Sequence, residues 1–126
     1  RRLLDCIAEN KISDVVTLGG DVHMSVAAVL RQEPNDTSMP PVASEFVTTS
    51  ISSRGMSETL LSTIRSSNAD ILHARSDERG YALVDFSPKR CLTEFRTTPT
   101  PAGTSDKLKV QARFAVESGQ PGPQLA

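Results

Sequence analysis

The sequence has few aromatic residues and lacks any long hydrophobic run. Its 126 residues include no Trp, one Tyr and four Phe, which limits the hydrophobic core to a modest size. No apolar stretch approaches the ~18 residues that a transmembrane helix needs, so we expect no membrane span. The formal net charge is -1 without a basic block, which argues against nucleic-acid binding. The length favours a single domain, residues 1–126.

Cysteine is also scarce. Cys6 and Cys91 are far apart and outside any metal-binding spacing, and whether they form a disulfide stays open. Cys6 lies on the apolar face of an expected helix and Cys91 in a strand pattern, so we expect both in the core. The sequence starts at Arg1 with neither a Met nor a signal segment, and we expect a piece whose start lies elsewhere. The localisation therefore stays open.

Residues 15–23, Val-Val-Thr-Leu-Gly-Gly-Asp-Val-His, form the stretch around which the chain is organised. Residues 15–18 are apolar and mostly β-branched, which predicts a short strand covered on both faces. The two glycines that follow permit backbone angles that a β-carbon forbids, and they let a ligand approach the main chain. Asp21 and His23 come next, at the carboxyl end of the strand, where open α/β sheets gather ligands.

Asp21 and His23 are the candidate metal ligands. In an extended segment, residues two apart point to the same side, so we expect both side chains to reach one ion while Val22 points into the core. A carboxylate with an imidazole suits iron, zinc, manganese or calcium. A catalytic ion needs about three protein ligands, so the others must come from elsewhere. The alternative is an ordinary strand end with a loop Asp and a half-buried His bonded to the backbone.

A hydroxyl-rich stretch supplies a second group of candidates. Residues 45–53 are dense in β-branched residues, which predicts a strand, and they end in Ser and Thr hydroxyls before Arg54. Near an anion site these hydroxyls and the guanidinium could bind phosphate oxygens. The alternative is a pleated surface with Arg54 in solvent. His73 is expected to be a surface or hydrogen-bonded residue, and the charges at 75–79 to form a solvated cluster.

The remaining pattern predicts a β-rich α/β fold. Apolar spacing of helical period near the start and after Ser57 predicts two helices, and alternation in the second half predicts strands. Residues 25–31 fit a helix or a strand, and we favour a strand. The expected elements are helix 1–10, strands 15–18, 25–31 and 45–53, helix 57–67, hairpin strands 80–86 and 91–97, and strand 107–117, with loops at 32–41, 68–79 and 98–106 and a polar tail at 118–126.

Several blocks together resemble one family. The chain is similar, over nearly all of its length, to the C-terminal part of the alkaline phosphatase D (PhoD-like) phosphatases, which are calcineurin-like metallophosphoesterases. Each block alone is weak, but they occur in the same order. The matching blocks are residues 2–4 through 14–16, the Gly-Asp-Val-His signature at 20–23, the strand at 45–53, the hairpin residues 79–81 and 83–85, and the end at 112–114 and 119–122.

The resemblance implies a function for the candidate residues. It implies the C-terminal portion of an αββα sandwich from a phosphoester hydrolase that uses iron and calcium, with Asp21 and His23 as metal ligands and catalytic residues. Such ions polarise the phosphoryl group and generate a nucleophile near neutral pH. Arg54 and Ser25 are weaker candidates for binding substrate. The family's other ligand motifs are missing here, so we expect an incomplete site that is inactive alone.

The resemblance also sets expectations about partners. The substrate would be a phosphoester, and the partner would be the missing N-terminal part of the same enzyme. A sheet separated from its other half exposes an apolar face and unpaired edges, so we expect self-association or marginal stability. Family members are often exported. The alternative function is a non-catalytic β-rich remnant or interaction module.

Overall fold

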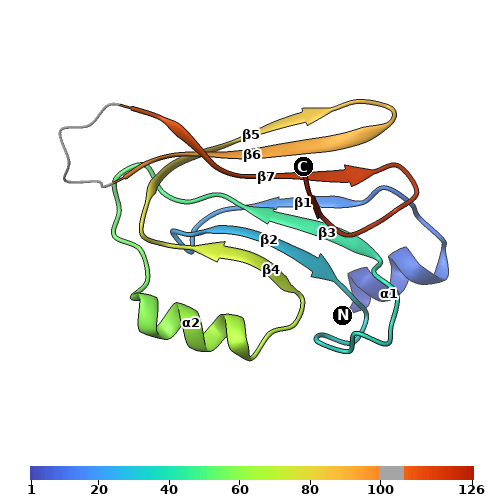
Figure 1. Cartoon of the computed structure of the whole chain (residues 1–126). Helices are drawn as coiled ribbons and strands as arrows, with labels where there is room; N and C mark the ends of the chain where they lie inside the picture. The colour runs from blue at the N-terminus through green and yellow to red at the C-terminus, as the bar shows by residue number, and fades with distance from the viewer. Residues whose placement is uncertain (100–106) are drawn as a thin grey trace.

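Two four-stranded sheets lie face to face and form the body of the molecule (Figure 1). In this computed structural model, the structure describes residues 1–99 and 107–126. The elements, in chain order, are α1 Arg2–Glu9, β1 Val16–Gly19, β2 Ser25–Leu30, β3 Ala43–Val47, α2 Glu58–Ser66, β4 Ile71–Arg75, β5 Arg79–Phe86, β6 Arg90–Thr98, β7 Lys109–Glu117 and β8 Gln124–Leu125.

The two sheets differ in strand direction. Sheet A has the order β1-β3-β2-β4 and is mixed, because β1 runs parallel to β3 whereas β2 is antiparallel to β3 and β4. Sheet B has the order β5-β6-β7-β8 and is antiparallel throughout, with β5 and β6 as a hairpin. This arrangement confirms the expected fold class, β-rich α/β with a mixed sheet and an antiparallel hairpin.

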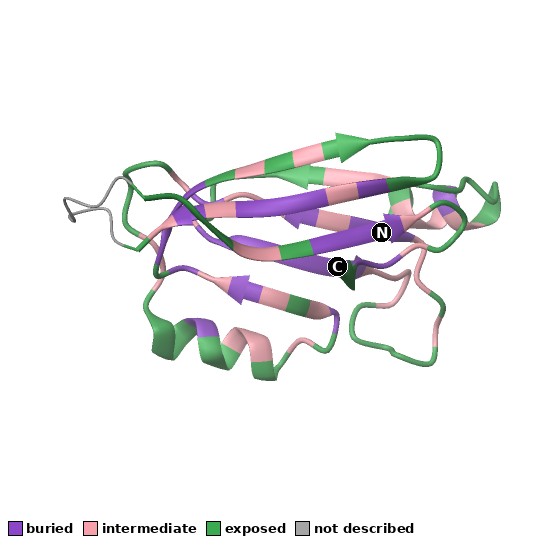
Figure 2. Cartoon of the chain, turned by 45° about the horizontal axis from the view of Figure 1, so that its top comes forward, coloured by how far each residue is buried: buried purple, intermediate pink, exposed green. Residues whose placement is uncertain are grey.

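The core between the sheets is built around three phenylalanines. Phe46 comes from β3, Phe95 from β6 and Phe114 from β7, and each is at most 2% exposed. Their ring centroids are 6.3 or 6.4 Å apart, a spacing at which aromatic pairs add stability beyond the area they bury. Buried residues accordingly concentrate on the strands that face each other (Figure 2). Three of the five aromatic residues of the chain therefore sit where the two sheets meet.

A second cluster lies on the outer face of sheet A. Leu61 of α2 is fully buried there and packs with buried side chains of the sheet. Figure 1 shows α2 on the side of sheet A that faces away from sheet B. The helix predicted after Ser57 is thus present and covers this face. The buried residues of the cluster are Met24, Val26, Ala28, Leu61 and Ala74.

β1 is an edge strand, and the expectation that it is covered on both faces is wrong. Among the described residues it pairs only with β3, so its other edge is open. Leu18 is 57% exposed, although the apolar run suggested burial. The apolar run shows that the strand is hydrophobic. It does not show whether another strand lies beside it.

The hydroxyl-rich strand is shorter at its end than predicted. β3 begins at Ala43 and ends at Val47, and residues 48–53 leave the sheet. Their hydroxyls bond to nearby main chain instead: Thr49 Oγ1 donates to the Glu78 carbonyl at 3.2 Å, and Ser50 Oγ donates to the Ser53 carbonyl at 2.8 Å. Side chains of this kind compete with the sheet for backbone groups, which explains the early end.

The prediction that residues 68–79 form a charged loop is largely wrong. This segment contains β4, which pairs antiparallel with β2, and Ala74 of this strand is 3% exposed. Glu78 and Arg79 are each 4% exposed, so they do not belong to a solvated cluster. Only Arg75 and Asp77 keep substantial exposure and form an ion pair. β4 is only five residues long and charged residues flank it, so the sequence around it did not predict a strand.

β7 follows the predicted alternation only in its second half. Phe114 and Val116 are buried, but Val110, which strict alternation along residues 107–117 places on the same face, is 46% exposed. The register with β6 skips one residue between Ala112 and Val110, which makes Gln111 the extra residue of a β-bulge. The bulge reverses the inward and outward positions, and it places the Gln111 amide against His73 of sheet A.

The ends of the chain also differ from expectation. Cys6 is exposed, so its predicted core position is wrong, whereas Cys91 is 5% exposed as expected, and both thiols are free. Residues 118–126, expected as a polar tail, contain β8, which pairs with β7. The Gly122 N–H also donates to Ser44 Oγ at 2.8 Å in the interior. In the ranges that the structure describes, no helix is long and apolar enough to cross a membrane.

Candidate metal-ligating loop

The loop that joins β1 to β2 carries both candidate metal ligands. Asp21 and His23 have φ values of 72° and 55°, in the left-handed region that side chains with a β-carbon seldom occupy. The Val22 N–H donates to the Gly20 carbonyl at 2.9 Å, which tightens the turn between them. Sheet pairing fixes the start of this turn, because the Thr48 N–H donates to the Gly19 carbonyl at 3.0 Å.

This geometry corrects the argument from an extended chain. Asp21 and His23 do not lie on a strand, so the rule that residues two apart share a face does not apply to them. Val22 is 46% exposed and does not point into the core, contrary to expectation. Strained backbone of this kind recurs at ligand sites, where the surrounding structure holds it in place. Asp21 is exposed and His23 is half-buried.

The imidazole of His23 is oriented by one hydrogen bond. Its Nδ1 lies 2.8 Å from the backbone carbonyl of Arg54, in the segment that follows β3. A carbonyl oxygen can only accept, so Nδ1 carries the proton and Nε2 of the neutral ring keeps its lone pair. A half-buried His bonded to the backbone was the alternative to a ligand, but metal-ligating histidines commonly donate their other N–H to a carbonyl. The contact therefore agrees with both interpretations.

The two predicted substrate-binding residues occupy different surroundings. The side chain of Arg54 is exposed, and within the described residues it makes no hydrogen bond or ion pair, so its guanidinium is free to meet an anion. Ser25, the first residue of β2, is 1% exposed. Its position suits support of the neighbouring loop better than direct contact with a substrate.

The described residues include no complete metal site. Residues 1–99 and 107–126 contain no group of three or more His, Cys, Asp or Glu side chains that could hold an ion. Asp21 and His23 nevertheless fit a borderline or hard cation chemically, because one is an exposed carboxylate and the other presents an imidazole lone pair. Completing such a site takes ligands from outside this set.

A second imidazole lies between the sheets. His73 of β4 stacks on Phe95 at a centroid distance of 5.7 Å, and its Nε2 lies 3.1 Å from Gln111 Oε1. The Gln111 amide nitrogen donates to Glu78 Oε2 at 2.8 Å, which leaves its oxygen to accept from His73. Burial lowers the pKa of His73, which Gln111 only partly opposes. In its neutral form this ring carries its proton on Nε2, because Gln111 Oε1 can only accept.

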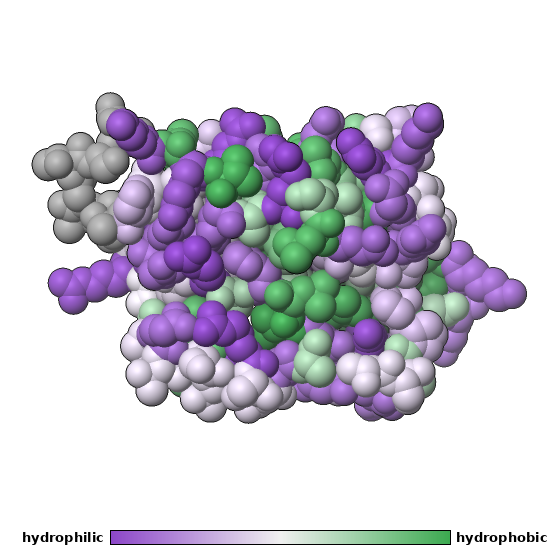
Figure 3. Space-filling model, viewed as in Figure 1, coloured by the Kyte–Doolittle hydropathy of each residue, from purple (hydrophilic) through white to green (hydrophobic). Residues whose placement is uncertain are grey.

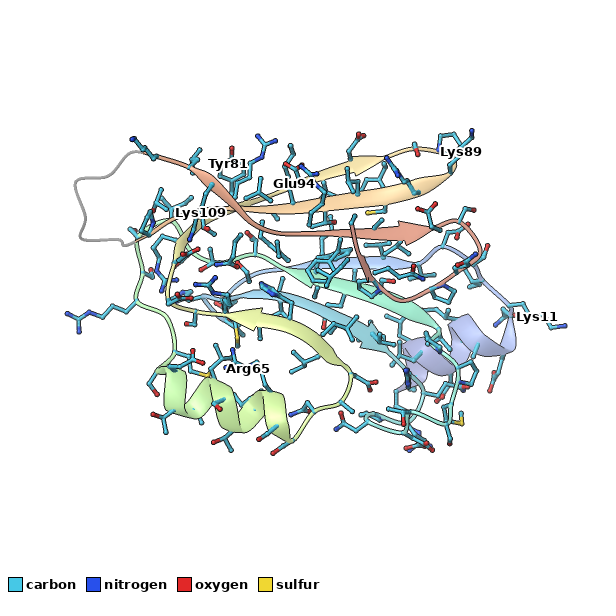
Figure 4. All side chains as sticks on the ribbon, viewed as in Figure 1. Lys11, Arg65, Tyr81, Lys89, Glu94 and Lys109 are labelled. Carbon is cyan, nitrogen blue, oxygen red and sulfur yellow. The ribbon has the colours of Figure 1, made fainter. Side chains whose placement is uncertain are left out.

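Glu78 is the acid that joins the sheets. Burial raises the pKa of its carboxyl, but hydrogen bonds from Lys109, Thr97 and Gln111 outweigh burial, and the net pKa lies below the usual 4.5. The Lys109 ammonium reaches it at 2.6 Å and the Thr97 hydroxyl at 2.6 Å. Figure 4 labels Lys109 on β7, beside the connection from β4 to β5. The sequence did not predict this network. It is completed by Gln111, and the β-bulge at Gln111 cannot be recognised from the alternation of apolar and polar residues in β7.

A solved structure shares this fold. The structure titled "Structure of PhoD" matches with a TM-score of 0.83 over 99% of this chain and 24% of that chain, at 24% sequence identity. The paired sheets with a helix outside sheet A are therefore the fold of one part of PhoD. This places the chain in the structural class of that protein.

Sequence comparisons give the family. The family described as PhoD-like phosphatase matches residues 1–95. Alkaline phosphatase D from Bacillus subtilis (strain 168) is 28% identical over 123 residues, which are 96% of this chain and 21% of that protein. The chain belongs to the PhoD-like phosphatase family, and it corresponds to the C-terminal part of such a protein. It spans about a fifth of the length of this relative.

Proposed function

We propose that this chain supplies Asp21 and His23 to the metal site of a phosphoester hydrolase. The remaining ligands would come from the rest of the enzyme, because the chain spans 21% of the curated relative and holds no complete group of ligands in its described residues. The proposed ions are iron and calcium, which the family resemblance implies. The substrate class is a phosphoester, in keeping with the name of the relative, alkaline phosphatase D.

The observation that carries the proposal is the orientation of His23. The Arg54 carbonyl fixes the proton on Nδ1, so the ring presents Nε2 in the form that binds a cation. Asp21, two residues earlier in the same turn, is exposed and adds a negative charge. An exposed acid and an imidazole already in the ligating tautomer are a pair that can hold an ion once further ligands are supplied.

The chemistry follows from these groups. Bound ions of this kind supply Lewis-acid polarisation of the phosphoryl group and a nucleophile near neutral pH. His23 and Asp21 hold and orient that centre, and the exposed guanidinium of Arg54 binds the phosphoryl oxygens. Ser25, the buried first residue of β2, is assigned the role of supporting the loop that it follows. Arg54 thus has two roles in this proposal. Its carbonyl orients the His23 imidazole, and its side chain binds the substrate.

Metal binding can be tested by calorimetric titration with Zn²⁺, a redox-inert probe. The background should be Cys6→Ser, because an exposed thiol binds Zn²⁺ itself. His23→Ala and Asp21→Asn are each expected to weaken binding about 10-fold or more. Asp85→Asn is the matched control, since Asp85 is an exposed acid on the outer hairpin. Equal affinities in all variants would refute the assignment of the ligands.

Hydrolysis tests the incomplete-site part of the proposal. The chain alone, supplied with iron and calcium, is expected to leave p-nitrophenyl phosphate and bis-p-nitrophenyl phosphate unhydrolysed. The whole enzyme that contains it is expected to hydrolyse one of them and to lose that activity with His23→Ala. Robust activity of the chain alone that His23→Ala abolishes would show that the described residues already form a complete site.

A further inference from the structure

A buried arginine lies directly beneath the ligand loop. Arg79, the first residue of β5, is 4% exposed, and the partners of its guanidinium among the described residues are neutral oxygens. Its NH1 donates to the His23 carbonyl at 3.1 Å and to Thr49 Oγ1 at 2.7 Å, and its NH2 donates to the Ser76 carbonyl at 2.5 Å. None of the ion pairs between described residues includes Arg79, and its buried Nε has no partner there. Burying a cation without an acid is costly, so stability alone is a poor explanation.

The same guanidinium also packs against the segment that orients the His23 ring. A β-carbon at Gly55 would lie 2.6 Å from Arg79 NH2, 2.1 Å from Ser76 Oγ and 2.4 Å from the Ser76 carbonyl oxygen. Gly55 therefore lies in direct contact with these groups, in a space that no other residue fits. The Arg54 carbonyl, which accepts from the imidazole, belongs to the peptide bond that ends at Gly55.

Arg79 thus touches both supports of one imidazole. One support is the main chain of His23 itself, which the guanidinium bonds directly. The other is the peptide of Arg54, which is held because Gly55 fits only against Arg79 and Ser76. Ser76 Oγ adds a weaker bond to the His23 carbonyl at 3.4 Å.

We propose that Arg79 is a positioning residue for His23, and that Gly55 is its required counterpart. Together they fix the ring so that Nδ1 bonds to Arg54 and Nε2 faces outward. The role of this ring in metal binding rests on the proposed function, whereas its orientation can be measured without a metal. Arg79 acts through His23 and touches neither metal nor substrate.

The experiment reads the tautomers of both imidazoles by ¹⁵N NMR of the histidine-labelled chain. The chain has only two histidines, and the structure gives them opposite tautomers, Nδ1–H in His23 and Nε2–H in His73. The pH should lie about two units above the ordinary histidine pKa of ~6.5, so that both rings are neutral. His73 reports whether the fold is intact, because its ring depends on contacts between the sheets.

Arg79→Met is expected to shift His23 toward the tautomer mixture of an unstructured histidine while His73 keeps its Nε2–H form. Gly55→Ala is expected to do the same through the Arg54 peptide. Arg75→Met is the matched control, because it removes a neighbouring cation that contacts Asp77 and Glu78 but not the loop. If Arg79→Met fails to fold, Arg79→Lys decides, since its single nitrogen cannot replace both guanidinium nitrogens, NH1 and NH2, that donate here.

The outcomes separate the two proposals. An unchanged His23 tautomer in folded Arg79→Met or Arg79→Lys would overturn the positioning role. A shifted tautomer with an about 10-fold weaker Zn²⁺ affinity in the Cys6→Ser background would support both proposals. A shifted tautomer in a protein whose wild type binds no Zn²⁺ would support the positioning role and count against the proposed function alone.

Discussion

The loop after β1 and the space between the sheets each hold one imidazole, and they hold it differently. His23 is half-buried in a turn of left-handed backbone, with Nδ1 fixed by a carbonyl and Nε2 without a hydrogen-bond partner in residues 1–99 and 107–126. His73 is stacked on Phe95, with Nε2 bonded to Gln111. The first ring, at the end of the loop after β1, makes one hydrogen bond to main chain. The second is closed in by its neighbours, and it contributes to the contact between the two sheets.

The largest expected difference between the two regions is in stability. Phe95→Ala should lower the free energy of unfolding by about 3–5 kcal/mol, because it opens a cavity among the three central rings. His23→Ala removes one hydrogen bond at the surface and should cost about 0.5–1.5 kcal/mol. Urea unfolding of both variants measures this. Equal losses would mean that the loop is as much a part of the core as Phe95.

The acid that joins the sheets should have the next largest effect. Glu78→Gln keeps the shape of the side chain but removes the charge that Lys109 and Thr97 contact, and we expect a loss of about 1–3 kcal/mol. Asp77→Asn is the control, because Asp77 is the exposed neighbour, and it should stay within about 0.5 kcal/mol of wild type. The comparison would fail if both substitutions cost the same in thermal unfolding.

The pH dependence of the free energy of unfolding should distinguish the contribution of His73 from that of Glu78, because the two act in different pH ranges. Because the folded pKa of His73 lies below its ordinary 6.5, the unfolded chain binds the proton more readily, and stability falls as the pH drops below about 6.5. One proton gives at most ~1.4 kcal/mol per pH unit. His73→Gln should remove this slope. The lowered pKa of Glu78 makes a separate contribution, which is present above 4.5 and lost below it. Equal slopes above pH 5 in wild type and His73→Gln would contradict this account.

The smallest expected effect concerns the open edge of sheet A. We propose that β1 promotes self-association, because Leu18 is 57% exposed on an edge strand that lacks a second neighbour among the described residues. Hydrophobic side chains also gather in the middle of the face seen in Figure 3. Leu18→Lys should raise the monomer fraction in sedimentation velocity with little change in stability. A wild-type chain that stays monomeric at high concentration would contradict the proposal.

Local patterns predicted the elements well where one face of each element is buried. The two helices, the β5–β6 hairpin and the second half of β7 follow from apolar spacing, because the residues that make the pattern are those that pack. The patterns failed where neighbours decide the outcome. β1 is exposed because no described strand pairs with its outer edge. β4 was concealed by neighbouring charged residues, of which Asp70, Glu78 and Arg79 turn out to be buried.

The site could be predicted only as a pair of residues. Asp21 and His23 are visible because two glycines and an apolar run precede them, and Arg54 because it follows a hydroxyl-rich segment. The contacts of Arg79 and Gly55 with the loop join segments that are far apart in the sequence, and no spacing indicates them. The local geometry was also wrong in the prediction, since an extended chain was assumed where the backbone turns left-handed.

The most direct test of the account is a Zn²⁺ titration of the Cys6→Ser chain followed by histidine ¹⁵N NMR. We predict that the Nε2 resonance of His23 shifts on binding while both nitrogens of His73 stay unchanged, and that Asp21→Asn weakens the response. A response at His73, or none at His23 over the range in which Zn²⁺ binds, would contradict the claim that this loop ligates a metal.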